Sequence, residues 1–197
     1  MRGSLIAFEG LDQSGKQTQA ESLRDALAER GHRCEMLSFP AYETAIGAEL
    51  HRSLHGQRDY TPDVMQLLYV ANRHEVKPSI DRWLAEGRVV LCDRYVASTV
   101  AYGVAQGLDR AWLQDIQRFL PEADLTILLD ITPDVAVARK AQGRDRFERD
   151  LALLNRVRDS YRRQAEGPRW TSIAAARPKE DVSADVRRAV SSRLGLL

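Results

Sequence analysis

The chain has 197 residues, 44% of them hydrophobic, and its 29 basic and 28 acidic side chains give a formal net charge of +1. This length suffices for one well-buried α/β domain and is short for two. The balanced charge excludes a basic tail or stripe for nucleic acid, so any anion site must be local. Residues 1–10 have too short an apolar stretch for a signal peptide or a membrane span, and we expect a cytoplasmic protein without membrane partners.

Short apolar runs bounded by turn residues predict five buried parallel strands. They cover residues 4–9, 33–39, 88–93, 124–130 and 170–174. Cys34 and Cys92 fall inside two of these runs and have no partner at metal-ligand spacing. We expect both to be reduced core residues.

Helical patterns lie between the strands, at residues 16–30, 62–86, 109–120 and 133–141. Pro78 is expected to break or bend the second of these helices. Residues 142–149 are densely charged and are expected to form a mobile surface loop between helices. The alternation of strand and helix predicts an α/β fold, a parallel sheet covered on both faces, with ligands at the carboxyl ends of the strands.

The segment after the first strand matches the phosphate-loop signature GxxxxGK, with one departure. Its backbone N–H groups and the helix N-terminus are suited to phosphate oxygens, and the lysine adds a charge for the β- and γ-phosphates. The residues predicted to bind ATP phosphates are Gly10, Leu11, Asp12, Gln13, Ser14, Gly15, Lys16, Gln17 and Thr18.

The departure is Gln17, which stands where the signature asks for the serine or threonine that binds Mg²⁺. Asp12 is therefore predicted to bind Mg²⁺ or to hold its water. Thr18 could supply the missing hydroxyl, although an α-phosphate contact is favoured. Asp93, at the end of the third strand, is a second candidate for holding metal-bound water. Arg94, beside it, could bind a phosphate bidentately or form a surface ion pair with Asp93.

Several motifs in chain order make the chain resemble the thymidylate kinase family of P-loop nucleoside monophosphate kinases. They are Phe8-Glu9-Gly10-Leu11-Asp12 with Gly15-Lys16, Phe39-Pro40, Tyr69-Val-Ala-Asn-Arg73, Asp93-Arg94-Tyr95-Val-Ala-Ser98-Thr99-Val-Ala-Tyr102, and Asp145-Arg146-Phe147-Glu148. The resemblance implies a three-layer P-loop NTPase fold with a five-stranded sheet. It also implies one kinase domain over residues 1–197, with a short lid near 142–149.

The implied reaction is phosphorylation of dTMP to dTDP by ATP with Mg²⁺, in a homodimer. By resemblance, Tyr69 stacks on thymine and Arg73 hydrogen-bonds the base, while Arg94 binds the substrate phosphate. The other implied substrate contacts are Phe39, Pro40 and Tyr42 over that phosphate, Ser98 and Thr99 near the base, Tyr102 at the sugar, and Glu148 near sugar and metal. Because Gln13 occupies the loop position where some members carry a catalytic arginine, the lid is expected to supply it through Arg144 or Arg146, with Arg139 and Arg149 as lesser candidates.

Catalysis then consists of aligning two phosphates and surrounding the transferred group with cations, without a general base. Some residues depart from the family pattern, notably Ala41, Asn72 and Ala175. Two alternatives are a kinase of broader base preference and a catalytically weak nucleotide-binding paralogue, the latter suggested by Gln13 and Gln17. A regulatory GTPase is disfavoured because the chain has no NKxD segment.

Overall fold

The sheet of the computed structural model, which describes residues 2–139 and 150–197, has five parallel strands. They are β1 (Leu5–Glu9), β2 (Cys34–Ser38), β3 (Val89–Asp93), β4 (Leu125–Asp130) and β5 (Trp170–Ala174). Their order across the sheet is β2-β3-β1-β4-β5, which places the phosphate-loop strand β1 in the middle. The predicted parallel sheet is confirmed, and each strand boundary lies within one residue of its predicted position.

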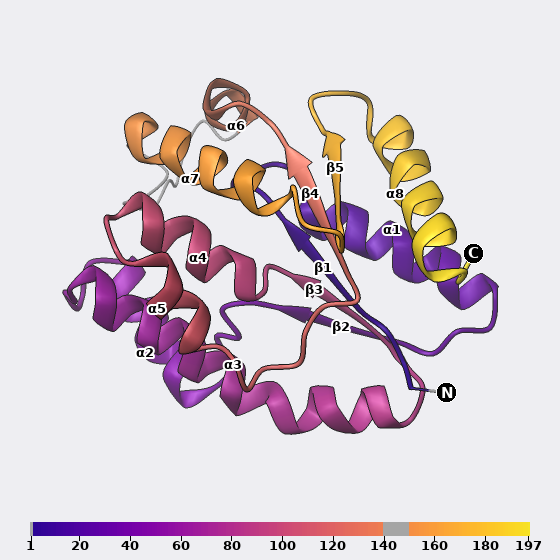
Figure 1. Cartoon of the computed structure of the whole chain (residues 1–197), viewed down its shortest axis with the longest axis horizontal. Coiled ribbons are helices and arrows are strands. Elements are labelled where there is room, and N and C mark those ends of the chain that lie inside the picture. The colour runs from indigo at the N-terminus through magenta and orange to yellow at the C-terminus, as the bar shows by residue number, and fades with distance from the viewer. Residues whose placement is uncertain (1, 140–149) are drawn as a thin grey trace.

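Helices cover both faces of the sheet and make three layers (Figure 1). On one face lie α1 (Lys16–Glu29) and α8 (Lys179–Leu194), and on the other lie α3 (Pro62–Ala85), α4 (Val96–Ala105) and α7 (Leu151–Gln164). The shorter helices are α2 (Ala45–Leu54), α5 (Arg110–Asp115) and α6 (Pro133–Arg139). No helix within the described residues is both long and apolar enough to cross a lipid bilayer.

The core follows from the alternation of side chains along the central strands. In β1, Leu5 and Ala7 pack into the cluster beneath α3, whereas Ile6 and Phe8 belong to the larger cluster that includes α1 and α8. All four side chains are at most 1% exposed. A strand that is buried on both faces reads as a continuous apolar run, which is why β1 was recognisable from sequence.

The helix α3 is continuous through Pro78, so the break that was one of the two outcomes expected there is absent. One other helix prediction was wrong. The helix expected at 109–120 ends as α5 at Asp115, and turns follow it up to Leu120. The first half of the expected helix does form, because the Asp109 side chain accepts a hydrogen bond from Trp112 N at 2.7 Å and caps α5.

The two outer strands are less buried than predicted. β2 and β5 form the sheet edges, and most of their residues are half-buried or exposed. Cys34 lies on β2, where it is half-buried and packs against the larger core cluster, so it belongs to the core only in part, while Cys92 is fully buried. Both are free thiols.

The helices α2, α4, α7 and α8 were not predicted, although three of them carry recognisable end signals. The side chain of Thr44 caps α2 by accepting from Gly47 N at 3.0 Å, and Asp150 caps α7 by accepting from Leu153 N at 2.9 Å. In α8, acidic residues occupy the first turn and Gly195 follows the last one with φ +64°.

Candidate active site

The phosphate loop joins β1 to α1 at the carboxyl edge of the sheet. Gly10 has φ +140°, and a Cβ atom there would lie 2.5 Å from the carbonyl oxygen of Leu129 on β4, so only glycine fits. Gly15 has φ +93° and precedes Lys16, the first residue of α1. Gln13 holds φ +63° without being glycine, a strained conformation of the kind found in ligand-binding loops.

The Lys16 side chain is buried against the phosphate loop. Its Nζ donates to the carbonyl oxygens of Leu11 at 2.8 Å and Gly10 at 3.3 Å, and the residue is only 6% exposed. Burial lowers the pKa of Lys16 to about 8, and the nearby positive charge of Arg94 contributes in the same direction. The ammonium group is therefore poorly neutralised inside the protein and is suited to receive an anion.

A groove at this edge contains most of the predicted phosphate-binding residues. It is lined by Asp12, Gln13, Gly15, Lys16, Gln17, Thr18, Ser38, Phe39, Pro40, Tyr42, Asp93 and Arg94. Leu11 and Ser14 are buried instead, at 2% exposure each. The amide of Gln17 donates to Glu21 Oε1 at 2.9 Å, one helical turn along α1.

Arg94 points into the site from a strained backbone position just after β3, with φ +65°. Its Nη2 lies 2.6 Å from Asp12 Oδ1, and its Nη1 lies 3.2 Å from both Ser98 Oγ and Tyr161 Oη. The alternative of an ion pair with Asp93 was wrong about the partner, which is Asp12. Burial alone would lower the pKa of Arg94, but Asp12 and nearby tyrosines raise it well above its ordinary value.

Glu9, at the end of β1, holds the residues that contact Arg94 on the side away from Asp12. Its fully buried carboxylate accepts hydrogen bonds from the N–H groups of Tyr95 and Ser98 at 2.8 and 3.2 Å. It also accepts from Ser98 Oγ at 2.7 Å and Tyr161 Oη at 2.9 Å. Glu9 thus satisfies free N–H groups at the start of α4 and fixes two hydroxyls that contact Arg94. Glu9 was not predicted as a site residue, although an acid that ends an apolar strand was a usable signal.

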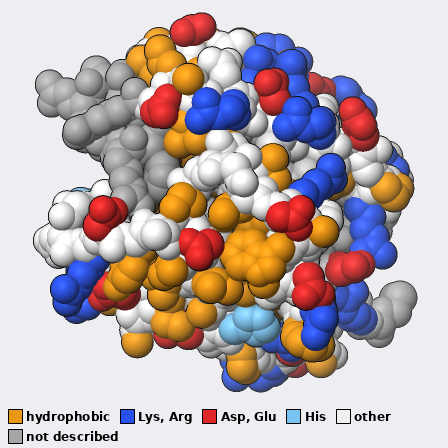
Figure 2. All heavy atoms as spheres, turned by 60° about the vertical axis from the view of Figure 1, so that its left-hand side comes forward, with side chains coloured by type: hydrophobic (Ala, Val, Ile, Leu, Met, Phe, Trp, Pro, Cys, Tyr) orange, Lys and Arg blue, Asp and Glu red, His pale blue; other side chains and the backbone are white. Residues whose placement is uncertain are grey.

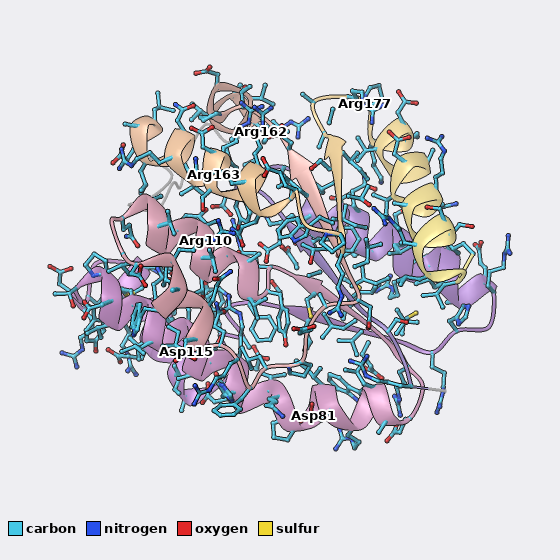
Figure 3. The ribbon with its side chains drawn as sticks, viewed as in Figure 1. Asp81, Arg110, Asp115, Arg162, Arg163 and Arg177 are labelled. Atoms are coloured by element: carbon cyan, nitrogen blue, oxygen red, sulfur yellow. The ribbon has the colours of Figure 1, made fainter. Side chains whose placement is uncertain are left out.

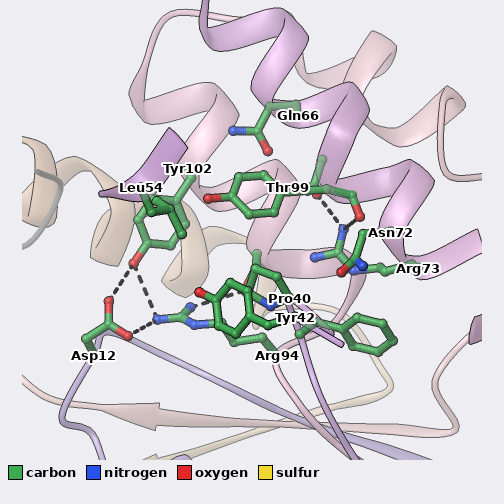
Figure 4. A pocket seen from close by; sticks show the side chains of 13 residues that line it. Asp12, Pro40, Tyr42, Leu54, Gln66, Asn72, Arg73, Arg94, Thr99 and Tyr102 are labelled. Carbon is green, nitrogen blue, oxygen red and sulfur yellow. Dashed lines mark hydrogen bonds and ion pairs between the residues drawn. The ribbon is translucent and has the colours of Figure 1, made fainter. Parts of the chain in front are cut away.

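A second pocket opens beside the groove, between α2, α3 and α4 (Figure 4). It is lined by Asp12, Phe39, Pro40, Tyr42, Leu54, Gln66, Tyr69, Asn72, Arg73, Arg94, Ser98, Thr99 and Tyr102. This list includes every predicted substrate residue that the structure describes. Leu54 and Gln66 were missed, because nothing local in the sequence marks them.

Arg73 is the buried cation of this second pocket. Its Nη1 donates to Thr99 Oγ1 at 2.8 Å and its Nη2 to the Tyr95 carbonyl at 2.6 Å, while the residue is 2% exposed. Its guanidinium carbon lies 5.7 Å from the centre of the Phe39 ring. Burial lowers the pKa of Arg73, and Nε has no hydrogen-bond partner among the described atoms.

Asn72 holds the turn after β2 against α3. Its Oδ1 accepts from Ala41 N at 2.8 Å, and its Nδ2 donates to the Ala41 carbonyl at 3.1 Å and to Thr44 Oγ1 at 2.8 Å. An ionised aspartate could accept from Ala41 N but could not donate to its carbonyl. Asn72, which departs from the family pattern, therefore has a structural role, because it fixes the turn that carries Tyr42. This turn follows the cis Phe39–Pro40 bond.

The two pockets share Asp12, Phe39, Pro40, Tyr42 and Arg94. A ligand in the groove and a ligand in the second pocket would therefore meet end to end at Arg94. The positive charge of Lys16, which lines the groove, would attract an anionic group there. Two anionic groups held in this way are suited to group transfer between them.

The acidic residues fit a divalent cation that is held mostly by ligand oxygens and water. Asp93 Oδ1 is buried without a partner among the described atoms, beside Lys16 and Thr18 in the groove. Within residues 2–139 and 150–197, no group of three or more His, Cys, Asp or Glu side chains could hold a metal alone. One or two carboxylates are what Mg²⁺ uses when phosphates complete its coordination.

Three predicted residues, Arg144, Arg146 and Glu148, lie outside the described residues, as does Arg149. Arg139 does not line either of the two pockets. It donates to the Gln13 carbonyl at 3.0 Å and to the Ala175 carbonyl at 2.9 Å, and so ties the phosphate loop to the end of β5.

The helix that follows residues 140–149 is anchored to the sheet by arginines. Asp130, at the end of β4, accepts hydrogen bonds from Arg158 and Arg162 on α7, with the shortest contact to each at 2.7 Å. Arg162 projects from α7 near the end of β4 (Figure 3). Tyr161, which directly precedes Arg162 on α7, contacts Glu9 and Arg94.

Comparison with known proteins gives a consistent result. The family model described as thymidylate kinase matches residues 8–186. The chain is 34% identical to thymidylate kinase of Schizosaccharomyces pombe, covering 97% of this chain and 93% of that protein. It is also 34% identical to the human thymidylate kinase, covering 94% and 89% respectively. A solved structure of thymidylate kinase from Candida albicans superimposes with a TM-score of 0.85 at 26% identity, covering 100% of this chain and 94% of that one.

Proposed function

The chain belongs to the thymidylate kinase family and transfers a phosphoryl group from ATP to dTMP, and we propose that its two joined pockets hold these substrates end to end. The observation that carries the proposal is the set of residues shared by the two pockets, centred on Arg94 and Asp12. The proposal takes residues 1–197 as one kinase domain. Neither a different base preference nor a catalytically weak paralogue is favoured by the similarity to thymidylate kinases.

On the acceptor side, we place the dTMP phosphate at Arg94 and the base beside Tyr69 and Arg73. The phosphate end is marked by Asp12 and Arg94, which lie together at one side of the pocket, with Arg73 farther along it (Figure 4). The Tyr102 ring lies 5.5 Å from the Arg94 guanidinium carbon, where it would pack against the sugar.

On the donor side, ATP phosphates would occupy the groove along residues 10–18. Lys16 would turn from the carbonyls of Gly10 and Leu11 to phosphate oxygens, which would raise its lowered pKa again. Mg²⁺ would neutralise phosphate charge and fix its geometry. Asp93, with its unpartnered oxygen, and Asp12 are the residues proposed to hold it through water or directly.

Asp12 and Arg94 form an ion pair, with Nη2 and Oδ1 only 2.6 Å apart. When the dTMP phosphate binds Arg94, it takes over the neutralising role of Asp12. The Asp12 carboxylate would then take part in holding Mg²⁺ on the donor side. No side chain needs to remove a proton, because the attacking phosphate oxygen is already ionised at neutral pH.

The first experiment is release of ADP, measured with ATP, Mg²⁺ and a panel of dTMP, dUMP, dCMP, AMP and GMP. We expect strong preference for dTMP. Arg94→Ala should lower kcat/KM for dTMP at least about 100-fold, because it removes a charge-assisted contact to the acceptor phosphate. Lys179→Ala, an exposed lysine on α8, serves as the control and should be unaffected. Full activity of Arg94→Ala would contradict the proposed placement of dTMP.

Catalytic cations from the segment 142–149 remain part of the proposal on sequence grounds. Arg144→Ala and Arg146→Ala are compared one at a time for kcat at saturating ATP and dTMP. A loss of about 1000-fold in one of them would identify the arginine that stabilises the transition state. Unchanged kcat in both would remove this segment from the mechanism.

We also propose a homodimer in the cytoplasm. One face of the molecule carries a patch of hydrophobic side chains bordered by charged ones (Figure 2), and among exposed apolar residues Leu67 on α3 is 45% and Phe119 is 67% exposed. The two free thiols fit a reducing compartment. Light scattering on the purified chain and on Leu67→Glu tests the dimer, and cell fractionation tests the location.

A further inference from the structure

Gln66 carries a buried polar atom that no other described residue satisfies. The residue is 1% exposed, lines the acceptor pocket, and its Oε1 has no hydrogen-bond partner among the described atoms. A buried amide oxygen without a partner is costly, so such an atom in a ligand pocket indicates a donor that arrives with the ligand.

The position of Gln66 on α3 places it with the residues proposed to contact the base. It lies three residues before Tyr69 and seven before Arg73, so the three side chains share one helix face. In the pocket, Gln66 lies on the side opposite Asp12 and Arg94 (Figure 4). A nucleotide whose phosphate binds Arg94 would therefore present its base toward Gln66.

The orientation of the amide is set by a second glutamine. Gln66 Nε2 donates to Gln106 Oε1 at 3.3 Å, at the C-terminal end of α4. With the amide nitrogen used in this way, Oε1 is the group left for the pocket. The site thus offers a hydrogen-bond acceptor from Gln66 and donors from Arg73.

We propose that Gln66 is a specificity residue for the base, and that its Oε1 accepts a hydrogen bond from N3–H of thymine. Thymine and uracil both carry a hydrogen on N3, whereas N3 of cytosine is an acceptor and would face the oxygen of Gln66 with two lone pairs opposed. Gln66 therefore selects for the imide edge of the pyrimidine. This inference rests on the proposed placement of the base beside Tyr69 and Arg73.

The test compares wild type with Gln66→Leu in steady-state kinetics with dTMP and dUMP, and with dCMP as a competitive inhibitor against dTMP. We expect KM for dTMP and dUMP to rise about tenfold with kcat within about twofold, as for a lost ground-state hydrogen bond. The inhibition constant of dCMP should stay unchanged or fall. The thermal midpoint should not decrease, because the variant removes an unsatisfied buried oxygen.

Gln117→Leu is the matched control. Gln117 is also a buried glutamine whose Oε1 has no partner among the described atoms, and it does not line the acceptor pocket. It should show the same change in thermal midpoint without any change in KM for dTMP.

Arg73→Ala distinguishes a failure of the role proposed for Gln66 from a failure of the placement of the base. If Arg73→Ala raises KM for dTMP and Gln66→Leu does not, the assignment of Gln66 is overturned while the base placement stands. If neither variant changes KM for dTMP, the base lies elsewhere and the proposed acceptor site is wrong as well. Equal weakening of dTMP and dCMP in Gln66→Leu also overturns the assignment, because a loss of packing alone would produce it.

Discussion

Replacing Lys16 by methionine should abolish phosphoryl transfer and yet stabilise the folded protein. Burial lowers the pKa of Lys16 from 10.5 to about 8. Each pKa unit corresponds to about 1.4 kcal/mol, so keeping this lysine charged in the fold costs about 3 kcal/mol at pH 7. Methionine removes that cost and keeps the length of the chain, but the carbonyls of Gly10 and Leu11 lose their donor. We expect Lys16→Met to raise the free energy of unfolding by about 2 kcal/mol at pH 7.

The stability difference between Lys16→Met and wild type should depend on pH in a specific way. Above pH 8 the folded protein releases the proton of Lys16, whereas the unfolded chain keeps it until about pH 10.5. Between these values the unfolded state binds more protons, so the stability of wild type rises with pH by up to about 1.4 kcal/mol per unit. The advantage of Lys16→Met should therefore be full below pH 8 and shrink above it.

Urea denaturation of both proteins, followed by tryptophan fluorescence at pH 7, 8, 9 and 9.5, measures this difference. Lys179→Met replaces an exposed lysine of α8 and should show no pH-dependent difference from wild type. A Lys16→Met protein that is less stable than wild type at pH 7 would refute the reasoning, and so would an advantage that stays constant from pH 7 to 9.5.

Three further substitutions test the supporting contacts. Asp12→Asn leaves Arg94 without its carboxylate at 2.6 Å, so urea denaturation should show a loss of about 1–2 kcal/mol and ADP release a fall in kcat of at least about 100-fold. Thr44→Ala removes the cap of α2, which should cost about 1 kcal/mol and raise KM for dTMP. Asp130→Asn weakens the contact with Arg158. Burial raises the pKa of Asp130, but hydrogen bonds from arginines hold it below its usual range, so a wild-type advantage of about 1 kcal/mol should persist at neutral pH and vanish as the pH falls below about 4. Unchanged stability of any variant at pH 7 contradicts its prediction.

The local features of the fold and of the donor site were predictable from sequence. The strand, the glycine loop and Lys16 follow one another along the chain, and apolar runs of five or six residues mark strands wherever they are buried on both faces. Residues on one helix face, such as Tyr69 and Arg73, could be placed together from their spacing. β2 and β5 were predicted as buried strands because their composition does not show that they lie at the sheet edges.

What the chain alone determined is therefore the order of its elements and the chemistry that each brings to the carboxyl edge of the sheet. Tertiary structure decided which of those groups meet. Arg94 pairs with Asp12, 82 residues away, rather than with its neighbour Asp93. Glu9 reaches Tyr161 across 152 residues, and Gln66 reaches Gln106 across 40. Such pairs leave no periodic trace in the sequence, because they depend on how separate helices pack onto the sheet and not on the spacing within any one of them.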